Sequence, residues 1–221
     1  MIGVAAGEAA VRLARSAIEL GLSAEPPSDP AEPFRSRSLP PAFDEHRGVF
    51  VTLTRFPNGT LRGCIGFPLP VYTLRAAIPR AAVAAAVEDP RFRPLDSTEV
   101  TEVVVEVSIL SVPKPIRSNR PERRRDQVEV GRHGLIVSRG RASGLLLPQV
   151  AVEYSWSADE FLSETCRKAV LPPDAWLSAE TRVDSFEAEV YGERTPAGPV
   201  ERRVSVDRTI ATEPAVAEPR K

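Results

Sequence analysis

The sequence predicts an α+β fold with antiparallel sheets. Helix-like and strand-like segments are interspersed along the 221 residues, and Asn58-Gly59 joins two apolar, β-branched runs as a hairpin. Pairing through a hairpin favours antiparallel sheets over a doubly wound parallel sheet. The prolines at 113, 115 and 121 indicate a boundary. Beyond it, an Arg-rich segment and a capped helix are expected to form a second lobe.

Two helices are predicted in the first half of the chain. Apolar residues at three- and four-residue spacing indicate an amphipathic helix around 11–20, and Gly21 follows where a left-handed cap is favoured. An Ala-rich stretch from 71 to 87 predicts the second helix. Because proline lacks an amide donor, Pro79 should kink or split this helix, and Asp89-Pro90 should end it.

Six strand-like runs accompany these helices. They are 48–54, 60–66, 102–110, 128–138, 144–147 and the alternating apolar residues at 186, 188 and 190. In 102–110 one face carries Val103, Val105, Val107 and Ile109, and the other carries Glu102, Val104, Glu106 and Ser108. That alternation predicts a half-buried strand. The last strand is expected to return to the first sheet.

A third helix has the clearest start signal in the sequence. Ser157 and Glu160 form a capping box, and Trp156 before the cap can pack on Phe161. The apolar positions that follow predict a helix that faces a core through Cys166. Residues 205–221 are polar and are expected to be a disordered tail.

The near-neutral total of 29 Lys+Arg against 30 Asp+Glu conceals a basic segment. Residues 112–141 carry nine basic and three acidic groups. Such a patch could attract phosphates. The alternative is a solvated loop and a charged strand edge, and the absence of an aromatic residue to stack on bases favours this alternative over nucleic-acid binding.

Composition and motifs exclude several classes of protein. Cys64 and Cys166 lie far apart, which excludes a C-x-x-C dithiol and a cysteine-rich zinc site. We found no signal peptide, membrane-length apolar run, phosphate loop, G-x-G-x-x-G or G-x-S-x-G. We therefore expect a cytoplasmic protein with no membrane association, no metal and no cofactor.

The run Leu61-Arg62-Gly63-Cys64-Ile65-Gly66 is the most unusual part of the sequence, because two glycines weaken a strand unless something approaches its backbone closely. Arg62 and Cys64 share one face. A guanidinium lowers the pKa of a nearby thiol, so Cys64 is a candidate nucleophile. In the alternative reading, Cys64 is a small buried residue and Arg62 pairs with a carboxylate such as Glu106.

Further polar residues are candidates for lining a ligand-binding cleft with Arg62 and Cys64. His133 lies between glycines, where its imidazole could project as a base, although a lone histidine of this kind is more often a turn residue. Gln149 and Glu153 could end a strand at a cleft. The full candidate set is Arg62, Cys64, Arg91, Glu106, His133, Gln149 and Glu153.

Six motifs, in order along the chain, resemble the AMMECR-type domain family, named for the Alport syndrome, intellectual disability, midface hypoplasia and elliptocytosis region. They are L-R-G-C-I-G (61–66), D-P-R-F-x-P-L (89–95), E-V-S-I-L (106–110), G-x-x-G-L-I-V (131–137), G-L-L-L-P-Q-V (144–150) and K-A-x-L-P-P-D-A-W (168–176). The resemblance implies one domain over 4–200. Its larger lobe (about 4–112 plus 180–200) would contain both termini, its smaller lobe would span about 113–179, and each would have an antiparallel sheet with flanking helices.

The resemblance also gives an expectation about function. Prokaryotic members look like one component of an AmmeMemoRadiSam set with a Memo-type protein and a radical-SAM protein, and animal members look like regulatory interaction proteins. We therefore expect a non-catalytic, partner-binding component that acts with such proteins. The alternative is an enzyme or small-ligand binder that uses an interlobe cleft with Cys64 and Arg62.

Overall fold

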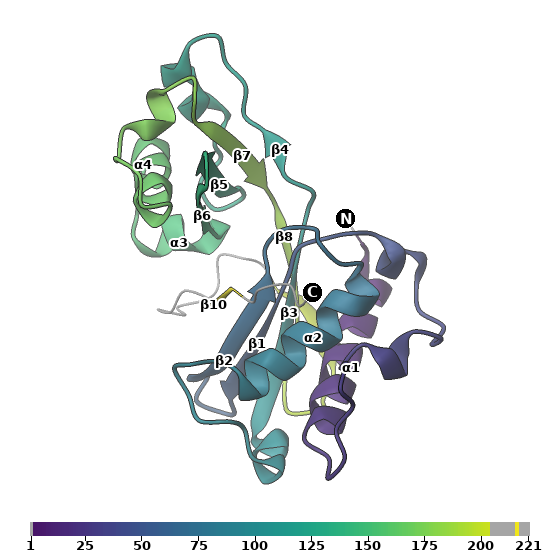
Figure 1. Ribbon diagram of the computed structural model, residues 1–221. Coiled ribbons are helices and arrows are strands. Elements are labelled where there is room, and N and C mark those ends of the chain that lie inside the picture. Colours follow the sequence, from purple (N-terminus) through teal and green to yellow (C-terminus); the bar gives the residue numbers. More distant parts are fainter. Residues whose placement is uncertain (1, 204–214, 217–221) are drawn as a thin grey trace. The chain divides into compact units, whose positions relative to one another are not determined.

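The computed structural model describes residues 2–203 and 215–216, which belong to two compact units (Figure 1). The larger unit contains residues 2–110, 189–203 and 215–216, and the smaller unit contains residues 111–188. Helices accompany a mainly antiparallel sheet in each unit, so the predicted α+β class is confirmed. None of the helices in these residues has the length and hydrophobicity of a membrane span.

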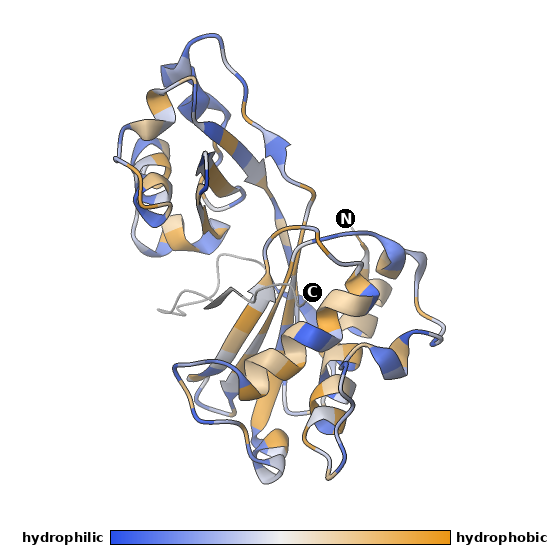
Figure 2. Ribbon diagram, in the orientation of Figure 1, coloured by the Kyte–Doolittle hydropathy of each residue, from blue (hydrophilic) through white to orange (hydrophobic). Residues whose placement is uncertain are grey.

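The larger unit is a six-stranded sheet with the order β10-β2-β1-β3-β8-β9. The strands are β1 (Val49–Arg55), β2 (Leu61–Phe67), β3 (Val103–Leu110), β8 (Ala188–Glu193), β9 (Val200–Arg203) and β10 (Ala215–Val216). The helices α1 (Val4–Gly21) and α2 (Leu74–Val87) pack against each other, and α2 contacts β1 and β2 while α1 contacts β3. Figure 2 shows hydrophobic residues concentrated along these helices and the central strands, where the core lies.

The β1–β2 hairpin forms as predicted around Asn58-Gly59. The Asn58 carboxamide oxygen accepts hydrogen bonds from the Thr60 amide at 3.1 Å and from its hydroxyl at 3.0 Å. Gly59 adopts a φ of 71°, a left-handed conformation that glycine tolerates without steric cost. This turn sets the register that places Thr52 opposite Cys64.

Two expectations about the helices differ from the structure. The second helix was expected to kink or split at Pro79, and no split occurs, since α2 is one helix from Leu74 to Val87. Its alanines pack in the core, and that burial outweighs the one backbone hydrogen bond that proline cannot make. Gly21 does not cap α1 but belongs to its last turn, and the C-cap is Leu22, with a φ of −99°.

Strand β3 is buried along its whole length, whereas the alternation predicted a half-buried strand. The open face was expected at Glu106 and Ser108, but these residues are only 3% and 7% exposed. The Glu106 carboxylate forms an ion pair with Arg203 at 3.4 Å. A polar pattern along one face therefore marks buried polar groups in this strand rather than a solvent-facing surface.

The smaller unit is a four-stranded sheet with the order β4-β7-β5-β6. Its strands are β4 (Lys114–Pro115), β5 (Gly134–Arg139), β6 (Ala142–Leu146) and β7 (Arg182–Phe186), and its helices are α3 (Pro148–Glu153) and α4 (Ala158–Lys168). The capping box at Ser157 is confirmed, and the rings of Trp156 and Phe161 lie 6.5 Å apart. Cys166 is fully buried in the core, as predicted.

Strand boundaries in this unit differ from the prediction. The run 128–138 becomes a strand only at Gly134, because Glu129 to His133 form a turn. The predicted last strand is two strands, β7 and β8, which belong to different sheets with Glu187 between them. The part that returns to the first sheet is β8. Apart from residues 215–216, the predicted tail at 205–221 lies outside the described residues.

Candidate functional site

The glycines of β2 allow close approach of neighbouring backbone. A Cβ atom at Gly63 would lie 2.0 Å from the carbonyl oxygen of Ala85, so α2 packs directly on the strand. A Cβ atom at Gly66 would lie 2.2 Å from the Val49 carbonyl oxygen. Ile65 joins the helix-covered core, which leaves Arg62 and Cys64 on the opposite face of the strand.

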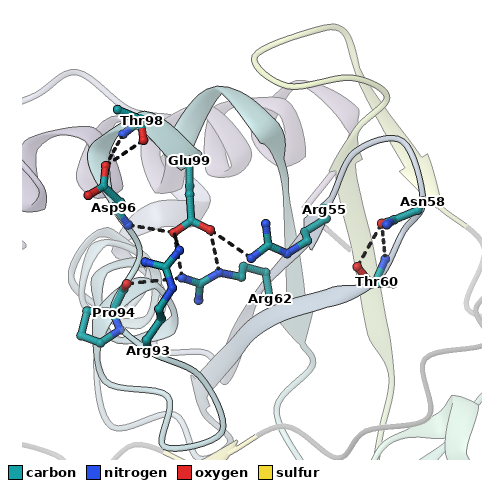
Figure 3. A network of polar contacts seen from close by, with 9 residues as sticks. All are labelled: Arg55, Asn58, Thr60, Arg62, Arg93, Pro94, Asp96, Thr98 and Glu99. Atoms are coloured by element: carbon teal, nitrogen blue, oxygen red, sulfur yellow. Dashed lines mark hydrogen bonds and ion pairs between the residues drawn. The ribbon is translucent and has the colours of Figure 1, made fainter.

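Arg62 is buried and forms an ion pair with Glu99, not with Glu106 (Figure 3). Its Nη2 donates to Glu99 Oε2 at 3.1 Å and to the Pro94 carbonyl at 3.3 Å. Glu99 lies in a 3-10 helix (Ser97–Glu102) and accepts the amide of Asp96 at 3.1 Å as part of a capping box. The alternative reading of Arg62 therefore had the correct kind of partner but the wrong carboxylate.

Two further guanidinium groups surround the Glu99 carboxylate. Arg55 donates to Oε1 at 3.0 Å, and Arg93 lies 3.1 Å from Oε2 (Figure 3). The hydrogen bond from Arg62 is the largest influence on this carboxyl and, with those from Asp96 and Arg55, lowers the pKa of Glu99 to about 2. Glu99 is thus a charged centre that joins β2, the β1–β2 hairpin and the segment 93–99.

Cys64 is held through its backbone by a second ion pair. The Cys64 amide donates to Asp89 Oδ2 at 2.8 Å, and its carbonyl accepts from Arg91 Nη2 at 3.2 Å. Arg91 also donates to both oxygens of Asp89, at 2.9 and 2.7 Å. Burial of Asp89 would raise its pKa, but the hydrogen bonds from Arg91 and the Cys64 amide outweigh that effect, so the pKa lies below its usual value.

The side chain of Cys64 belongs to a row of polar residues across three strands. The register places Cys64 opposite Thr52 and Thr52 opposite Glu106. The Cys64 sulfur lies 3.1 Å from Thr52 Oγ1, and Cys64 is only 6% exposed. The thiol is therefore a buried, hydrogen-bonded group.

These contacts fix the segment 89–96 on the edge of β2. Asp89 and Arg91 hold its start, and Glu99 holds its end through Arg62 and Arg93. The Phe92 ring lies close to two cations, with the Arg91 guanidinium 5.6 Å and the Arg62 guanidinium 6.0 Å from its centre. We call Arg91, Phe92 and Arg93 the RFR surface. It presents two cations and an aromatic ring in one defined conformation.

Four of the seven candidate residues, Arg62, Cys64, Arg91 and Glu106, belong to the larger unit, and the other three belong to the smaller unit. His133 is a half-buried turn residue whose Nδ1 accepts the amide of Glu129 at 3.0 Å. Gln149 and Glu153 lie in α3 rather than at a strand end as predicted. The proline at the first position of α3 explains this error, because it favours a helix start.

Sequence reasoning missed Thr52, Asp89 and Glu99 as members of the site. A signal for Glu99 was present, because Asp96-Ser97-Thr98-Glu99 has the capping-box spacing. Thr52 carried no signal, since its role depends on the register of β1 with β2. Within the described chain, no three His, Cys, Asp or Glu side chains gather closely enough to hold a metal ion.

Comparisons with known proteins gave consistent results. A domain-family profile described as AMMECR1 matches residues 11–191. Protein PF1979 of Pyrococcus furiosus is 52% identical over 204 residues, which cover 89% of this chain and 92% of that protein. Protein MJ0810 of Methanocaldococcus jannaschii is 44% identical over 194 residues, which cover 88% and 93%, respectively. The crystal structure of uncharacterized protein PH0010 from Pyrococcus horikoshii matches with a TM-score of 0.79 at 48% identity, covering 92% of this chain and 98% of that one.

Proposed function

The chain belongs to the AMMECR1 family, and we propose that it is a non-catalytic binding module whose RFR surface receives a protein partner. The observation that carries this proposal is that polar groups of β2 hold the neighbouring segment 89–99 in place. Arg62 and the Cys64 backbone bind Glu99, Asp89 and Arg91, and thereby fix the segment that presents the RFR surface.

The chemistry of the RFR surface favours an acidic partner. Arginine and aromatic residues dominate the binding energy of many protein interfaces, and a surface that is already ordered loses little entropy on association. Arg93 is 68% exposed at its side chain, and Arg91 is 27% exposed. The candidate partners are a Memo-type protein and a radical-SAM protein from the same organism.

The test compares two arginines in matched settings. Arg93→Ala removes a cation that is 68% exposed and lies 3.1 Å from Glu99, and Arg35→Ala removes one that is 69% exposed and lies 3.1 Å from Asp29. Both residues lie in the larger unit, and both variants should fold. We expect Arg93→Ala to weaken binding to the purified Memo-type or radical-SAM protein by about tenfold or more, while Arg35→Ala binds like the wild type. Equal affinity of the two variants, or binding of neither protein by the wild type, would contradict the proposal.

A second candidate function is an enzyme or small-ligand binder that uses Cys64 and Arg62. The observation in its favour is the Arg91 guanidinium, whose Nη2 donates to the Cys64 carbonyl at 3.2 Å and so places a cation next to this cysteine. Titration of Cys64 with a thiol reagent across pH separates the two candidates, because a nucleophile requires an apparent pKa well below about 8.5. A Cys64→Ser protein that folds but loses its cellular phenotype, beside an Arg93→Ala protein that retains it, would favour this candidate.

A further inference from the structure

A hollow of about 300 Å³ lies within the smaller unit and has no part in the site described above. It lies among residues 115–118, the 3-10 helix Pro121–Gln127 and residues 179–183. Its polar lining consists of Arg117, Ser118, Arg124, Thr181 and Arg182. This volume is at the small end of the range of ligand pockets, which suits a small ion or the end group of a larger molecule.

Arg124 is a buried cation that lacks a carboxylate partner. It is 7% exposed, and its Nη1 donates to the carbonyls of Trp176 and Ser178. No Asp or Glu in the described part of the chain forms an ion pair with it, and its Nε has no hydrogen-bond partner there. Burial lowers the pKa of Arg124, as expected for a charge with no nearby counter-charge.

A second polar group in the lining is also buried and unpaired. Thr181 is 1% exposed, and its Oγ1 has no hydrogen-bond partner in the described residues. Arg117 is exposed at the rim of the hollow, and Arg182 lies beside it on β7 in an ion pair with Asp184 at 2.6 Å. Buried charges are normally paired, so this combination indicates an anion that the chain itself does not supply.

Other arginines of the basic segment already have partners. Arg123 pairs with Asp126 at 3.0 Å, Arg125 with Asp159 at 3.1 Å, and Arg132 with Glu129 at 2.9 Å. The exposed residues Arg117, Arg120 and Arg141 have no ion pair in the described part of the chain, and water can solvate their charges. Arg124 differs from them because it is buried and lines the hollow.

We propose that this hollow binds a small phosphate-type oxyanion, with Arg124 as the buried counter-charge, Thr181 as a hydroxyl donor and Arg117 as a second cation at the rim. Guanidinium and hydroxyl donors together match the several acceptor oxygens of a phosphate. The anion is inorganic phosphate or the phosphate of a phosphomonoester.

The experiment is calorimetric titration of the full chain with inorganic phosphate, and separately with adenosine monophosphate, at constant ionic strength. Arg117→Gln should weaken phosphate binding about tenfold or more, and Thr181→Val should weaken it about three- to tenfold. Arg141→Gln is the matched control, because it removes the same charge from an exposed residue of the same segment that does not line the hollow. Arg124 is left intact, since its carbonyl contacts could be needed for folding.

The outcomes are distinct. Similar affinity for the two compounds identifies inorganic phosphate as the ligand, and tighter binding of the monophosphate identifies a phosphomonoester; both support the proposal. The proposal is overturned if the wild type shows no saturable binding, or if Arg141→Gln weakens binding as much as Arg117→Gln does. The latter result would indicate a diffuse electrostatic surface of the kind that nucleic acid uses. Neither outcome affects the proposal for the RFR surface, which lies in the other unit.

Discussion

Replacing Glu99 with Gln should test whether the ion pairs, rather than the apolar core alone, hold the segment 89–99 in place. The substitution keeps the shape of the side chain but removes its charge. Arg62, which is only 3% exposed at its side chain, then retains the Pro94 carbonyl but no anion. The side chains of Arg55 and Arg93 are 37% and 68% exposed, so water can solvate their charges when the Glu99 carboxylate is removed.

The cost of breaking the buried Arg62–Glu99 ion pair can be expressed in two ways that give a similar magnitude. Removal of one partner of a buried ion pair costs about 3–5 kcal/mol, and the exposed partners add little. The pKa of Glu99 is about 2 in the folded chain against an ordinary 4.5, and a difference of this size corresponds to about 3 kcal/mol. We therefore expect Glu99→Gln to lower the free energy of unfolding by about 3 kcal/mol at pH 7, and the melting temperature by about 6–12 °C.

The pH dependence follows from the direction of the shift. Because the pKa is lowered in the folded chain, the stabilisation is complete above pH 4.5 and is lost as the pH falls towards 2. The difference in unfolding free energy between wild type and Glu99→Gln should therefore shrink across this window in urea titrations followed by circular dichroism. Glu45→Gln is the control, since Glu45 is 52% exposed in its pair with Arg47 and should contribute less than about 1 kcal/mol. A Glu99→Gln protein as stable as this control, or a difference that does not change between pH 5 and pH 3, would refute the reasoning.

Three further outcomes are expected. Gly63→Ala should destabilise the chain by at least about 2 kcal/mol in urea unfolding, because the new Cβ atom would meet the Ala85 carbonyl oxygen at 2.0 Å. A smaller loss of stability would show that α2 can shift. Ser157→Ala should cost about 1 kcal/mol by the same measurement, because the hydroxyl caps the Glu160 amide; unchanged stability would mean that the cap is not needed. Cys166 should react with a thiol reagent only after unfolding, because the residue is fully buried and burial raises the pKa of its thiol. Stoichiometric reaction of Cys166 in native buffer would contradict this prediction.

Local signals predicted much of the fold. The Asn58-Gly59 turn and the Ser157 capping box act through neighbouring residues, and both form as predicted. Errors arose where distant parts of the chain decide the outcome. Pro79 is accommodated in α2 because the helix packs on the sheet, and β3 is buried on both faces, with a partner for Glu106 supplied by Arg203 from β9.

In the candidate site, too, features set by local geometry were predicted and features set by distant parts of the chain were not. Alternation along β2 correctly placed Arg62 and Cys64 on one face, because this depends only on strand geometry. The choice of Glu99 over Glu106 as the partner of Arg62 depends on how the segment after α2 folds back on the strand. Charge complementarity indicated that a carboxylate was needed, but the identity of that carboxylate is a property of the tertiary structure.

The Asp89–Cys64 hydrogen bond makes one backbone amide a reporter of local opening. Most amides within a sheet are protected by neighbouring strands, and their hydrogen exchange requires strands to separate. The Cys64 amide is instead protected by a carboxylate on the segment that follows α2. Its exchange rate would therefore measure how often that segment lifts away while the sheet stays intact, and slower exchange in the presence of a partner would record the segment being held in place.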